Sequence, residues 1–429
     1  MRRRTTTVGA VAALAAFGLT ACGAGGSTGG PLDSTGPIDI WYSNNEQELA
    51  WGQQMVEAWN AEHPDEQITA QEIPAGRSSE EVLGAAIAAG TAPCLVFNTA
   101  PAAVGQFAKQ GGLLDLTRFE GGAEYIEERS GDLAAQYASA DGAYFQLPWK
   151  SNPVQIFYNR ELFAEAGLDP DEPRLATYDE FLDTARTLVE SGAAPYAIWP
   201  APTSEFFQIQ FDFLPLYAAE TGGAPLLDGD ASTFASDEGA AVAEFWHTLY
   251  TEGLAGQEKY TGDAFADGQA AMSIVGPWAI SVYEDVDWGS VPVPTSGGMP
   301  TDEIWTFSDA KNIGLYRACD HPATAWEVLK FATSEEQDGL FLELTGQMPL
   351  REGLAETYAD YFAANPDYVA FGEQAARVVE VPTSPNTVAM LQALRDAWSG
   401  AVIFGGPDAD VRAALDDAAV KFDDLARQP

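Results

Sequence analysis

Five of the eleven tryptophans stand beside turn-forming residues, where side chains are close to solvent. An indole face is flat, apolar and rigid, which suits the C–H face of a pyranose ring, while nearby amides, carboxylates and ammonium groups can bind its hydroxyls. These tryptophans are Trp41 at a strand end, Trp149 after Pro148, Trp199 before Pro200, Trp278 after Gly276 and Pro277, and Trp305 beside a Gly/Pro-rich loop. For any single one, the alternative is an ordinary core position. The set indicates a candidate carbohydrate-binding surface.

Polar side chains follow two predicted strands of the chain. They are Asn44, Asn45 and Glu46 after the strand 37–42, and Asn98 and Thr99 after the strand 95–97. In open parallel sheets, ligands bind beyond the carboxyl ends of the strands, so these loops are candidate binding loops. The alternative is turn chemistry, because asparagine and serine favour loops in any case.

The elements that position these residues alternate between strand and helix. After the strand 37–42 comes a helix whose apolar residues share one side, followed by a strand at 68–73, a helix at 79–89 that ends at Gly90, and the strand 95–97. This alternation predicts an α/β fold with a mainly parallel sheet covered by helices.

Length and charge restrict the class of protein. The 429 residues are enough for two domains of ordinary size. The net charge of −43 comes from 21 basic and 64 acidic residues spread along the whole chain, so no surface is expected to neutralise a row of phosphates. Nucleic acid is therefore excluded as an expected partner.

Motifs for covalent chemistry are mostly missing from the sequence. It contains no Gly-x-x-x-x-Gly-Lys-Ser/Thr, Gly-x-Ser-x-Gly or His-Glu-x-x-His pattern, and it has three histidines. Glu244 and His247 are spaced as half of a metal site, but we expect a structural role for His247. Neither a metal nor a cofactor is predicted, and the chain is not expected to be an enzyme. Glycoside hydrolysis stays open as the main alternative, because it needs only two carboxylates a few Å apart.

The first residues predict export. Arg2–Arg4 form a positive region, 8–19 an apolar run too short to cross a bilayer as a helix, and 19–22 a small-residue cleavage site that ends in cysteine. The stretch "LTAC" resembles a bacterial lipobox. We therefore expect a signal peptide at 1–21, lipidation of Cys22, and a flexible Gly/Ser tether over 22–37 that holds the protein at the extracellular face of the cell membrane. Of the other cysteines, Cys94 and Cys319 are candidates either for a disulfide or for two free buried thiols.

An ordered set of segments resembles the extracellular solute-binding lipoproteins of carbohydrate ABC importers, family 1, the maltose-binding-protein-like group. The segments are "LTAC", "GTAPCLVFNTA", "FAKQGGLLDL", "IFYNRELFAEAGL", "FADGQAAMSIVGPWAI" and "HPATAWEVLKFATSEEQ", and they span almost the whole mature chain in the expected order. The resemblance implies a monomer that captures a sugar, expected to be a di- or oligosaccharide, with high affinity and delivers it to the permease subunits of an ABC transporter. A non-sugar polar solute such as a glycerophosphodiester is an alternative ligand.

The resemblance also implies a two-lobed, class II type periplasmic-binding-protein-like fold with the ligand in a cleft between the lobes. The expected N-terminal lobe is 38–148 with 307–345, and the expected C-terminal lobe is 149–306 with 346–429. The chain is then expected to cross between the lobes near 147–150, 305–309 and 346–350.

The family's motifs assign candidate roles to particular residues. The tryptophan of the "GPW" turn commonly stacks on a sugar, and this role carries over to Trp278. The stretch "APYAIWP" implies Tyr196 or Trp199 as a second aromatic wall, and Lys150 stands at a crossing where a charged residue often reaches the ligand. The segment "PTSPNTVAML" lacks the tryptophan that the maltose binders have there, which leaves Asn386 as a polar candidate and argues against carrying over maltose itself.

The same resemblance bears on the two cysteines. In the family's first lobe, the strand that follows Cys94 is antiparallel to a returning strand, here 312–319, so that Cys94 and Cys319 become neighbours. A disulfide that closes so long a loop is worth on the order of 5 kcal/mol in the chain-entropy model. We therefore predict the bond.

Overall fold

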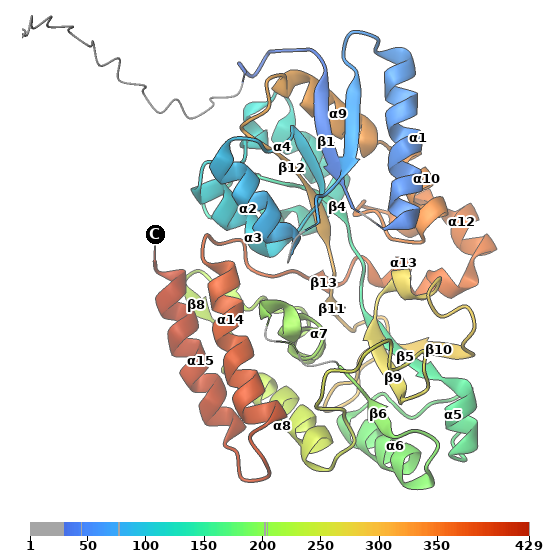
Figure 1. The fold of residues 1–429 in the computed structure, drawn as a ribbon. Helices are drawn as coiled ribbons and strands as arrows, with labels where there is room; N and C mark the ends of the chain where they lie inside the picture. Colours follow the sequence, from blue (N-terminus) through green and yellow to red (C-terminus); the bar gives the residue numbers. More distant parts are fainter. Residues whose placement is uncertain (1–29, 44, 76–77, 201–202, 204, 429) are drawn as a thin grey trace, which may run out of the picture.

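The computed structural model describes residues 30–428 except 44, 76–77, 201–202 and 204. The expected signal peptide at 1–21, the lipidation site Cys22 and the binding candidate Asn44 lie outside the described residues. Figure 1 shows the chain as two halves, one built around β1 and one around β5, with connecting segments between them. We call them the first and the second lobe.

The first lobe is built on a five-stranded sheet of order β2-β1-β3-β12-β4. Its strands are β1 (Ile38–Tyr42), β2 (Ile68–Glu72), β3 (Leu95–Thr99), β4 (Leu147–Lys150) and β12 (Lys311–Leu315). The strand β1 pairs in parallel with β2 and β3, as the alternating pattern predicts, whereas β12 returns antiparallel to β3. The carboxyl ends of β1 and β3 therefore lie at one edge of the sheet, which faces the second lobe (Figure 1).

Helices cover both faces of this sheet. They are α1 (Glu46–Glu62), α2 (Ser79–Ala89), α3 (Pro101–Lys109), α4 (Gly122–Ser130), α9 (Pro322–Ala332) and α10 (Glu335–Thr345), with the short helices η1 (Leu116–Arg118) and η2 (Gly131–Tyr137). Local chemistry fixes their ends: the Asn45 side chain accepts the amides of Gln47 and Glu48 at the start of α1, and Gly90 ends α2 in the left-handed conformation. The sequence predicted both the start of α2 near Ser79 and its end at Gly90.

The second lobe has a four-stranded sheet of order β10-β5-β9-β6. Its strands are β5 (Gln155–Asn159), β6 (Tyr196–Ile198), β9 (Ala270–Val275) and β10 (Trp288–Val291). The surrounding helices are α5 (Arg160–Glu165), α6 (Tyr178–Ser191), α7 (Phe213–Thr221), α8 (Asp237–Thr251), α11 (Leu354–Thr357), α12 (Ala359–Ala364), α13 (Val369–Gln374), α14 (Thr387–Ala397) and α15 (Val411–Ala426). Short elements complete it: η3 (Phe206–Gln210), β7 (Leu227–Asp228), β8 (Ala231–Ser232), η4 (Pro277–Ala279), η5 (Pro366–Tyr368) and η6 (Trp398–Ile403).

The chain passes between the lobes at three places. The first follows β4, which extends the first sheet to Lys150, two residues past the expected boundary at 148. The second includes β11 (Thr306–Phe307), which pairs with β13 (Val378–Val379) in a separate two-stranded sheet. The third follows α10, where the Leu350 amide donates to the Trp149 carbonyl. The three passages lie near the expected segments, while the exact lobe boundaries stay a prediction.

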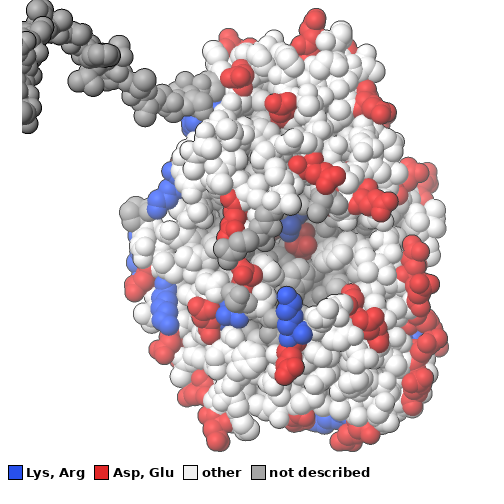
Figure 2. All heavy atoms as spheres, viewed as in Figure 1, with Lys and Arg blue, Asp and Glu red and all other residues white. Residues whose placement is uncertain are grey.

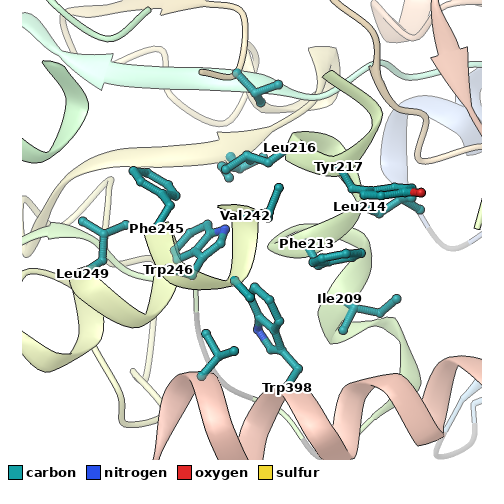
Figure 3. Close-up of a cluster of buried hydrophobic side chains, with 14 of the residues drawn as sticks. Ile209, Phe213, Leu214, Leu216, Tyr217, Val242, Phe245, Trp246, Leu249 and Trp398 are labelled. Atoms are coloured by element: carbon teal, nitrogen blue, oxygen red, sulfur yellow. The ribbon is translucent and has the colours of Figure 1, made fainter. Parts of the chain in front are cut away.

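Each lobe has its own apolar core. In the first lobe, alternation along β1 sends Ile38 and Ile40 to one face and Trp41 to the other, so that two clusters form on either side of the sheet. The largest cluster fills the second lobe, where Figure 3 shows Trp246 of α8 and Trp398 of η6 gathered with Phe213 of α7. The Phe213 and Trp398 rings contact each other edge to face at 5.4 Å between centroids. These cores make each lobe a separately packed body.

The predicted disulfide between Cys94 and Cys319 is present, and it joins positions 225 residues apart. It lies where β3 and β12 run antiparallel, as the resemblance implied. The N-terminal segment docks beside it: the Gly30 amide donates to the Cys319 carbonyl, and Ser34 Oγ lies 2.9 Å from His321 Nδ1. The expected flexible tether over 22–37 thus differs from the structure at its end, because 30–37 is attached to the first lobe.

No helix in the described part of the chain is long and apolar enough to cross a membrane.

Candidate functional site

Two adjoining cavities lie at the edge of the second lobe that faces the first lobe. The larger of the two, about 280 Å³, lies between the lobes, with Ala100 and Pro101 of the first lobe opposite Phe206 of the second. The smaller, about 220 Å³, is lined by Trp199, Thr203, Ser273 and Ile274 among others. Phe207 and Phe211 line both cavities. Figure 2 shows the surface hollowed between the two halves of the molecule. We call the two cavities together the cleft.

Aromatic side chains of the second lobe form one wall of this cleft. Trp199, Phe206, Phe207 and Phe211 line the two cavities, and Trp278 contacts Phe211 next to them; we call these five residues the aromatic wall. The Phe211 ring contacts Trp278 and Phe307 edge to face, at 6.5 Å and 5.9 Å between centroids. The Phe207 side chain is 41% exposed, which is unusual for a large apolar residue in this protein. An exposed ring at a cavity is suited to stacking on a flat apolar ligand surface.

Trp278 is positioned by the turn that precedes it. Pro277 begins the short helix η4, as its missing N–H and fixed φ predict, and the indole folds back over Gly276. A Cβ atom at Gly276 would lie 2.0 Å from Trp278 Cζ3, so the position requires glycine for steric reasons. The Trp278 side chain is half-buried and packs against both apolar clusters of the second lobe.

Trp199 and Tyr196, the other aromatic pair predicted from the sequence, lie together. Their rings contact edge to face at 4.7 Å, and Trp199 Nε1 donates to the Glu258 carbonyl at 2.8 Å. The Tyr260 ring contacts the other side of Trp199 at 5.1 Å. Trp199 lines the smaller cavity, with Tyr196 behind it at the end of the second sheet.

β3 runs two residues beyond its expected end at 97, so the two polar candidates lie at the end of the strand and not in a loop, directly before the cavity-lining Ala100. Asn98 has φ of +82°, and its buried Oδ1 has no hydrogen-bond partner among the described residues. Such strain and an unpaired acceptor are typical of a ligand-contacting position. Its neighbour Thr99 is fully buried instead, where Oγ1 donates to the Val96 carbonyl and meets Tyr316 Oη at 3.3 Å. Of the two candidates at the end of β3, Asn98 is the one with an unused polar atom.

Two further candidates, Asn45 and Glu46, are exposed at the start of α1. Asn45 Oδ1 already accepts two amides as the helix cap, at 3.0 Å each. Trp41, which precedes this loop, is 9% exposed and packs under α2 and α3. The structure therefore separates the loop, which is open to solvent, from the tryptophan, which belongs to the core.

Trp149 and Lys150 are buried where the first chain passage begins. Trp149 is 1% exposed and lies among Trp51, Phe97 and Phe341, so no face of its ring is open to a ligand. Lys150 Nζ forms a 2.5 Å ion pair with Glu48 Oε1, which also accepts from Gln347 Nε2 at 2.8 Å. Burial lowers the pKa of Lys150, against the effect of the Glu48 carboxylate. The structure thus assigns both residues to the core of the first lobe and the chain passages.

The remaining candidates lie away from the cleft. Trp305 packs over Gly223 and lines a separate groove of about 1090 Å³, which we call the rear groove and which includes residues 130–133 and 349–356. Asn386 Nδ2 donates to the carbonyls of Leu425 and Gln428, so this residue joins the start of α14 to the end of α15. His247 Nε2 lies 2.7 Å from the Gly406 carbonyl, a structural contact of the expected kind.

Two buried carboxyls line the cleft, and sequence reasoning identified neither. Asp212 lines the smaller cavity and Glu380 the larger, and each has one oxygen without a partner among the described residues, Asp212 Oδ1 and Glu380 Oε2. Burial raises the pKa of Asp212 to about 7, although Gln208 and Trp398 donate to its other oxygen. Burial also raises the pKa of Glu380 to about 8, against the Val381 amide and Lys311. Such perturbed groups in a cleft mark a functional site.

The three phenylalanines of the wall were also missed, although the run "SEFFQIQF" contained a signal. Phe206 and Phe207 are adjacent, and they follow a turn-rich stretch just before a buried helix. No group of His, Cys, Asp or Glu among the described residues is arranged to hold a metal ion.

A two-lobed α/β protein with an aromatic, hydrogen-bonding cleft between its lobes belongs to the class that binds solutes by enclosure. The sequence matches the family of bacterial extracellular solute-binding proteins over residues 43–339, and the chain belongs to this family. It is 25% identical over 363 residues to a maltotriose-binding protein of Pyrococcus abyssi, covering 82% of this chain and 74% of that protein. It is 26% identical over 265 residues to a diacetylchitobiose-binding protein of Streptomyces coelicolor, covering 58% of each chain.

Solved structures show the same fold. The cyclic α-maltosyl-1,6-maltose binding protein of Arthrobacter globiformis superposes with a TM-score of 0.77 at 21% identity, covering 92% of this chain and 99% of that one. The sugar-binding protein MalE of Xanthomonas citri superposes with a TM-score of 0.70 at 20% identity, covering 91% and 97%. The expected maltose-binding-protein-like, two-lobed fold is thereby confirmed.

Proposed function

We propose that this protein captures a di- or oligosaccharide outside the cell and delivers it to the permease of an ABC importer. The observation that carries the proposal is the aromatic wall, with Phe207 41% exposed, across the cleft from the loops of the first lobe. Two of the relatives are named as binding proteins for maltotriose and for diacetylchitobiose, and the family consists of binding proteins. No covalent chemistry is part of the proposed cycle, which consists of binding, lobe closure and release.

The chemistry of the cleft supports a sugar as the ligand. Rings such as Trp278, Trp199 and Phe211 can cover the apolar faces of a sugar. Polar groups can take its hydroxyls: the unpaired Asn98 Oδ1, and the pair formed by Lys311 Nζ and Asp309 Oδ1 at 2.6 Å. Asn45 and Glu46 would act at the rim of the site, where they are exposed. Binding of micromolar strength corresponds to about 8 kcal/mol, which a few stacked rings and several hydrogen bonds supply after ordering costs.

The proposal includes an anchor and a partner. Cleavage after residue 21 and lipidation of Cys22 would hold the protein at the extracellular face of the membrane. Because residues 30–37 dock on the first lobe, the tether would be limited to 22–29. The protein would act as a monomer, and the permease would recognise the closed form.

A thermal-shift screen tests the function. Purified protein is heated with maltotriose, longer maltodextrins, diacetylchitobiose and a glycerophosphodiester, and the sugars are analysed afterwards by chromatography. A ligand at 100 times its Kd should add about 2.7 kcal/mol to the free energy of unfolding. We expect stabilisation by a saccharide and full recovery of that saccharide. Stabilisation by the diester alone would identify a different solute class, and release of shorter sugars would identify a hydrolase.

A matched pair of variants shows whether the shift comes from the cleft. Trp278→Ala removes a ring of the aromatic wall, whereas Trp288→Ala removes a ring that stacks on Phe157 at 4.5 Å on the other side of the second sheet. We expect the sugar-induced shift to be smaller in the first variant than in the natural protein and to be kept in the second. Equal shifts in both variants would contradict the proposed site.

A further inference from the structure

Glu380 is a buried carboxyl with one unused oxygen. The side chain is 5% exposed and lines the larger cavity of the cleft, directly after β13. Its Oε1 accepts the Val381 amide at 2.7 Å, while Oε2 has no hydrogen-bond partner among the described residues. Leaving a buried acceptor unpaired destabilises the folded protein. A group that bears this cost beside a cavity is a candidate for binding whatever enters the cavity.

The charged and titratable neighbours of Glu380 come from three sides. Lys311 on β12 and Asp309 just before it form a 2.6 Å ion pair. The Lys311 charge lowers the pKa of Glu380, and the Asp309 charge raises it. On η2, burial and the Glu380 charge raise the pKa of Tyr137. The Glu380 amide donates to Gln136 Oε1, also on η2, at 2.9 Å. Glu80 of α2 lines the same cavity, and its charge contributes to raising the pKa of Lys311. One lysine that is already paired therefore faces up to three carboxyls.

This balance favours the protonated form of Glu380 below about pH 8 in the absence of a ligand. Burial disfavours its charge more than Lys311 and the Val381 amide favour it, which raises its pKa to about 8. A bound hydroxyl would change the balance, because an ionised carboxylate accepts a stronger hydrogen bond than a neutral acid does. The Lys311 ammonium, 29% exposed at the same cavity, can donate to a neighbouring hydroxyl. Together they match the vicinal hydroxyls of a sugar ring, one of which donates and one of which accepts.

We propose that Glu380 is a specificity-determining residue of the cleft, whose Oε2 accepts a hydrogen bond from a sugar hydroxyl as its own proton is released to the solvent. This inference rests on the proposed function and adds the residue that distinguishes sugars by the positions of their hydroxyl groups. Stacking on the aromatic wall alone discriminates poorly between sugars, because most pyranoses offer an apolar face. A carboxylate and an ammonium at fixed positions discriminate by the placement of the hydroxyls.

The sign of the pH effect follows from linkage. The pKa of Glu380 is raised in the empty protein, and a ligand that binds the ionised form lowers it, so the complex holds fewer protons than the free protein. Affinity should therefore rise with pH up to about 8 and level off above that value. The limit is a tenfold gain per pH unit for one released proton.

Isothermal titration calorimetry tests this coupling. The probe is whichever of maltotriose, maltodextrin and diacetylchitobiose stabilises the protein most in the screen above. It is titrated at pH 6, 7 and 8, in phosphate and in Tris, whose different ionisation enthalpies report the number of protons released. For the natural protein, we expect proton release at pH 7 and at least tenfold tighter binding at pH 8 than at pH 6.

Glu380→Gln keeps the size of the side chain and mimics its protonated form, so the fold should persist. We expect this variant to bind at every pH with the weak affinity that the natural protein has at pH 6, and to release no proton. Glu373→Gln is the control, because it removes a carboxylate from an exposed position on α13. It should keep both the affinity and the proton release of the natural protein.

The possible failures are distinguishable. If the sugar binds without proton release, or if release persists in Glu380→Gln, the inference is overturned while the proposed function stands. Persistent release would point to Asp212, the other carboxyl with a raised pKa in the cleft. If none of the sugars binds, the proposed function fails first and this inference fails with it.

Discussion

Two groups of aromatic residues in this protein have similar composition and opposite surroundings. In the first lobe, Trp51, Trp149, Phe97 and Phe341 lie with ring centroids 4.8–5.7 Å apart, and none is more than 1% exposed. In the second lobe, the aromatic wall also consists of tryptophan and phenylalanine, but it lines a cavity, and Phe207 is 41% exposed. We call the first group the buried aromatic cluster.

The difference comes from what covers each group. The buried aromatic cluster lies between the first sheet and the helices α1 and α10, which pack on each other and close over the rings. The aromatic wall adjoins the cavities between the lobes, and Phe207 stays exposed there. An aromatic residue near a turn is therefore a ligand candidate only when the elements around it leave one ring face open.

The largest expected effect concerns the bond that holds the first lobe together. The double variant Cys94→Ser, Cys319→Ser opens a loop of 225 residues and should lose about 5 kcal/mol of unfolding free energy. Guanidinium unfolding measures the loss, and sugar affinity should be unchanged because the bond is remote from the aromatic wall. Reductant should destabilise the natural protein and have no effect on the variant. Equal stability of variant and natural protein would contradict the assigned role.

Trp149→Ala tests the buried aromatic cluster. Removing a ring that is 1% exposed should cost about 3–5 kcal/mol of stability, because it leaves a cavity among Trp51, Phe97 and Phe341. The measurement is again chemical unfolding, followed by sugar titration at a temperature where the variant stays folded. A stable variant that no longer binds sugar would mean that Trp149 contacts the ligand, and the distinction between the two groups would then be wrong.

Trp278→Ala tests the aromatic wall. Affinity should fall by one to two orders of magnitude, about 1.4–2.8 kcal/mol, because a stacked ring face is lost. The loss of stability should be smaller than for Trp149→Ala, since Trp278 is only half-buried. Calorimetry gives the affinity, with Trp288→Ala as the control ring on the opposite side of the sheet. Unchanged affinity would remove Trp278 from the site.

The smallest effect is expected for Phe207→Ala. Stability should change by no more than about 0.5 kcal/mol, because the ring is largely exposed, while affinity should fall several-fold. Phe404→Ala is the matched control, because Phe404 is 58% exposed at the end of η6 and lines neither cavity of the cleft. If both variants bind sugar equally well, the exposure of Phe207 has no part in ligand binding.

Much of the fold could be predicted from the sequence because it depends on local signals. The alternation of strands and helices, the end of α2 at Gly90 and the start of η4 at Pro277 each follow from hydrophobic period or backbone preference. The disulfide between Cys94 and Cys319 required the family resemblance, because 225 residues separate the two positions and no local pattern connects them.

The site was less predictable because it depends on which side chains remain uncovered. Trp149 and Trp278 both follow a proline in the sequence, yet one is buried by α1 and α10 and the other is half-buried against Phe211, which lines the cleft. In the sequence, nothing distinguishes Glu380 from the other acidic residues, of which there are 64 in all. Only the fold shows that it lines a cavity and that its Oε2 has no partner among the described residues. Exposure and unpaired polar atoms are properties of tertiary packing, and a sequence pattern records them only indirectly.

Hydrogen–deuterium exchange with and without saturating sugar tests most directly whether the cleft, and not the larger rear groove, is the binding site. We predict slower exchange of the backbone amides in 206–211 and 276–283, next to the aromatic wall, and no change in α9 of the first lobe. Protection confined to 130–136 and 349–356, which line the rear groove, would contradict the account.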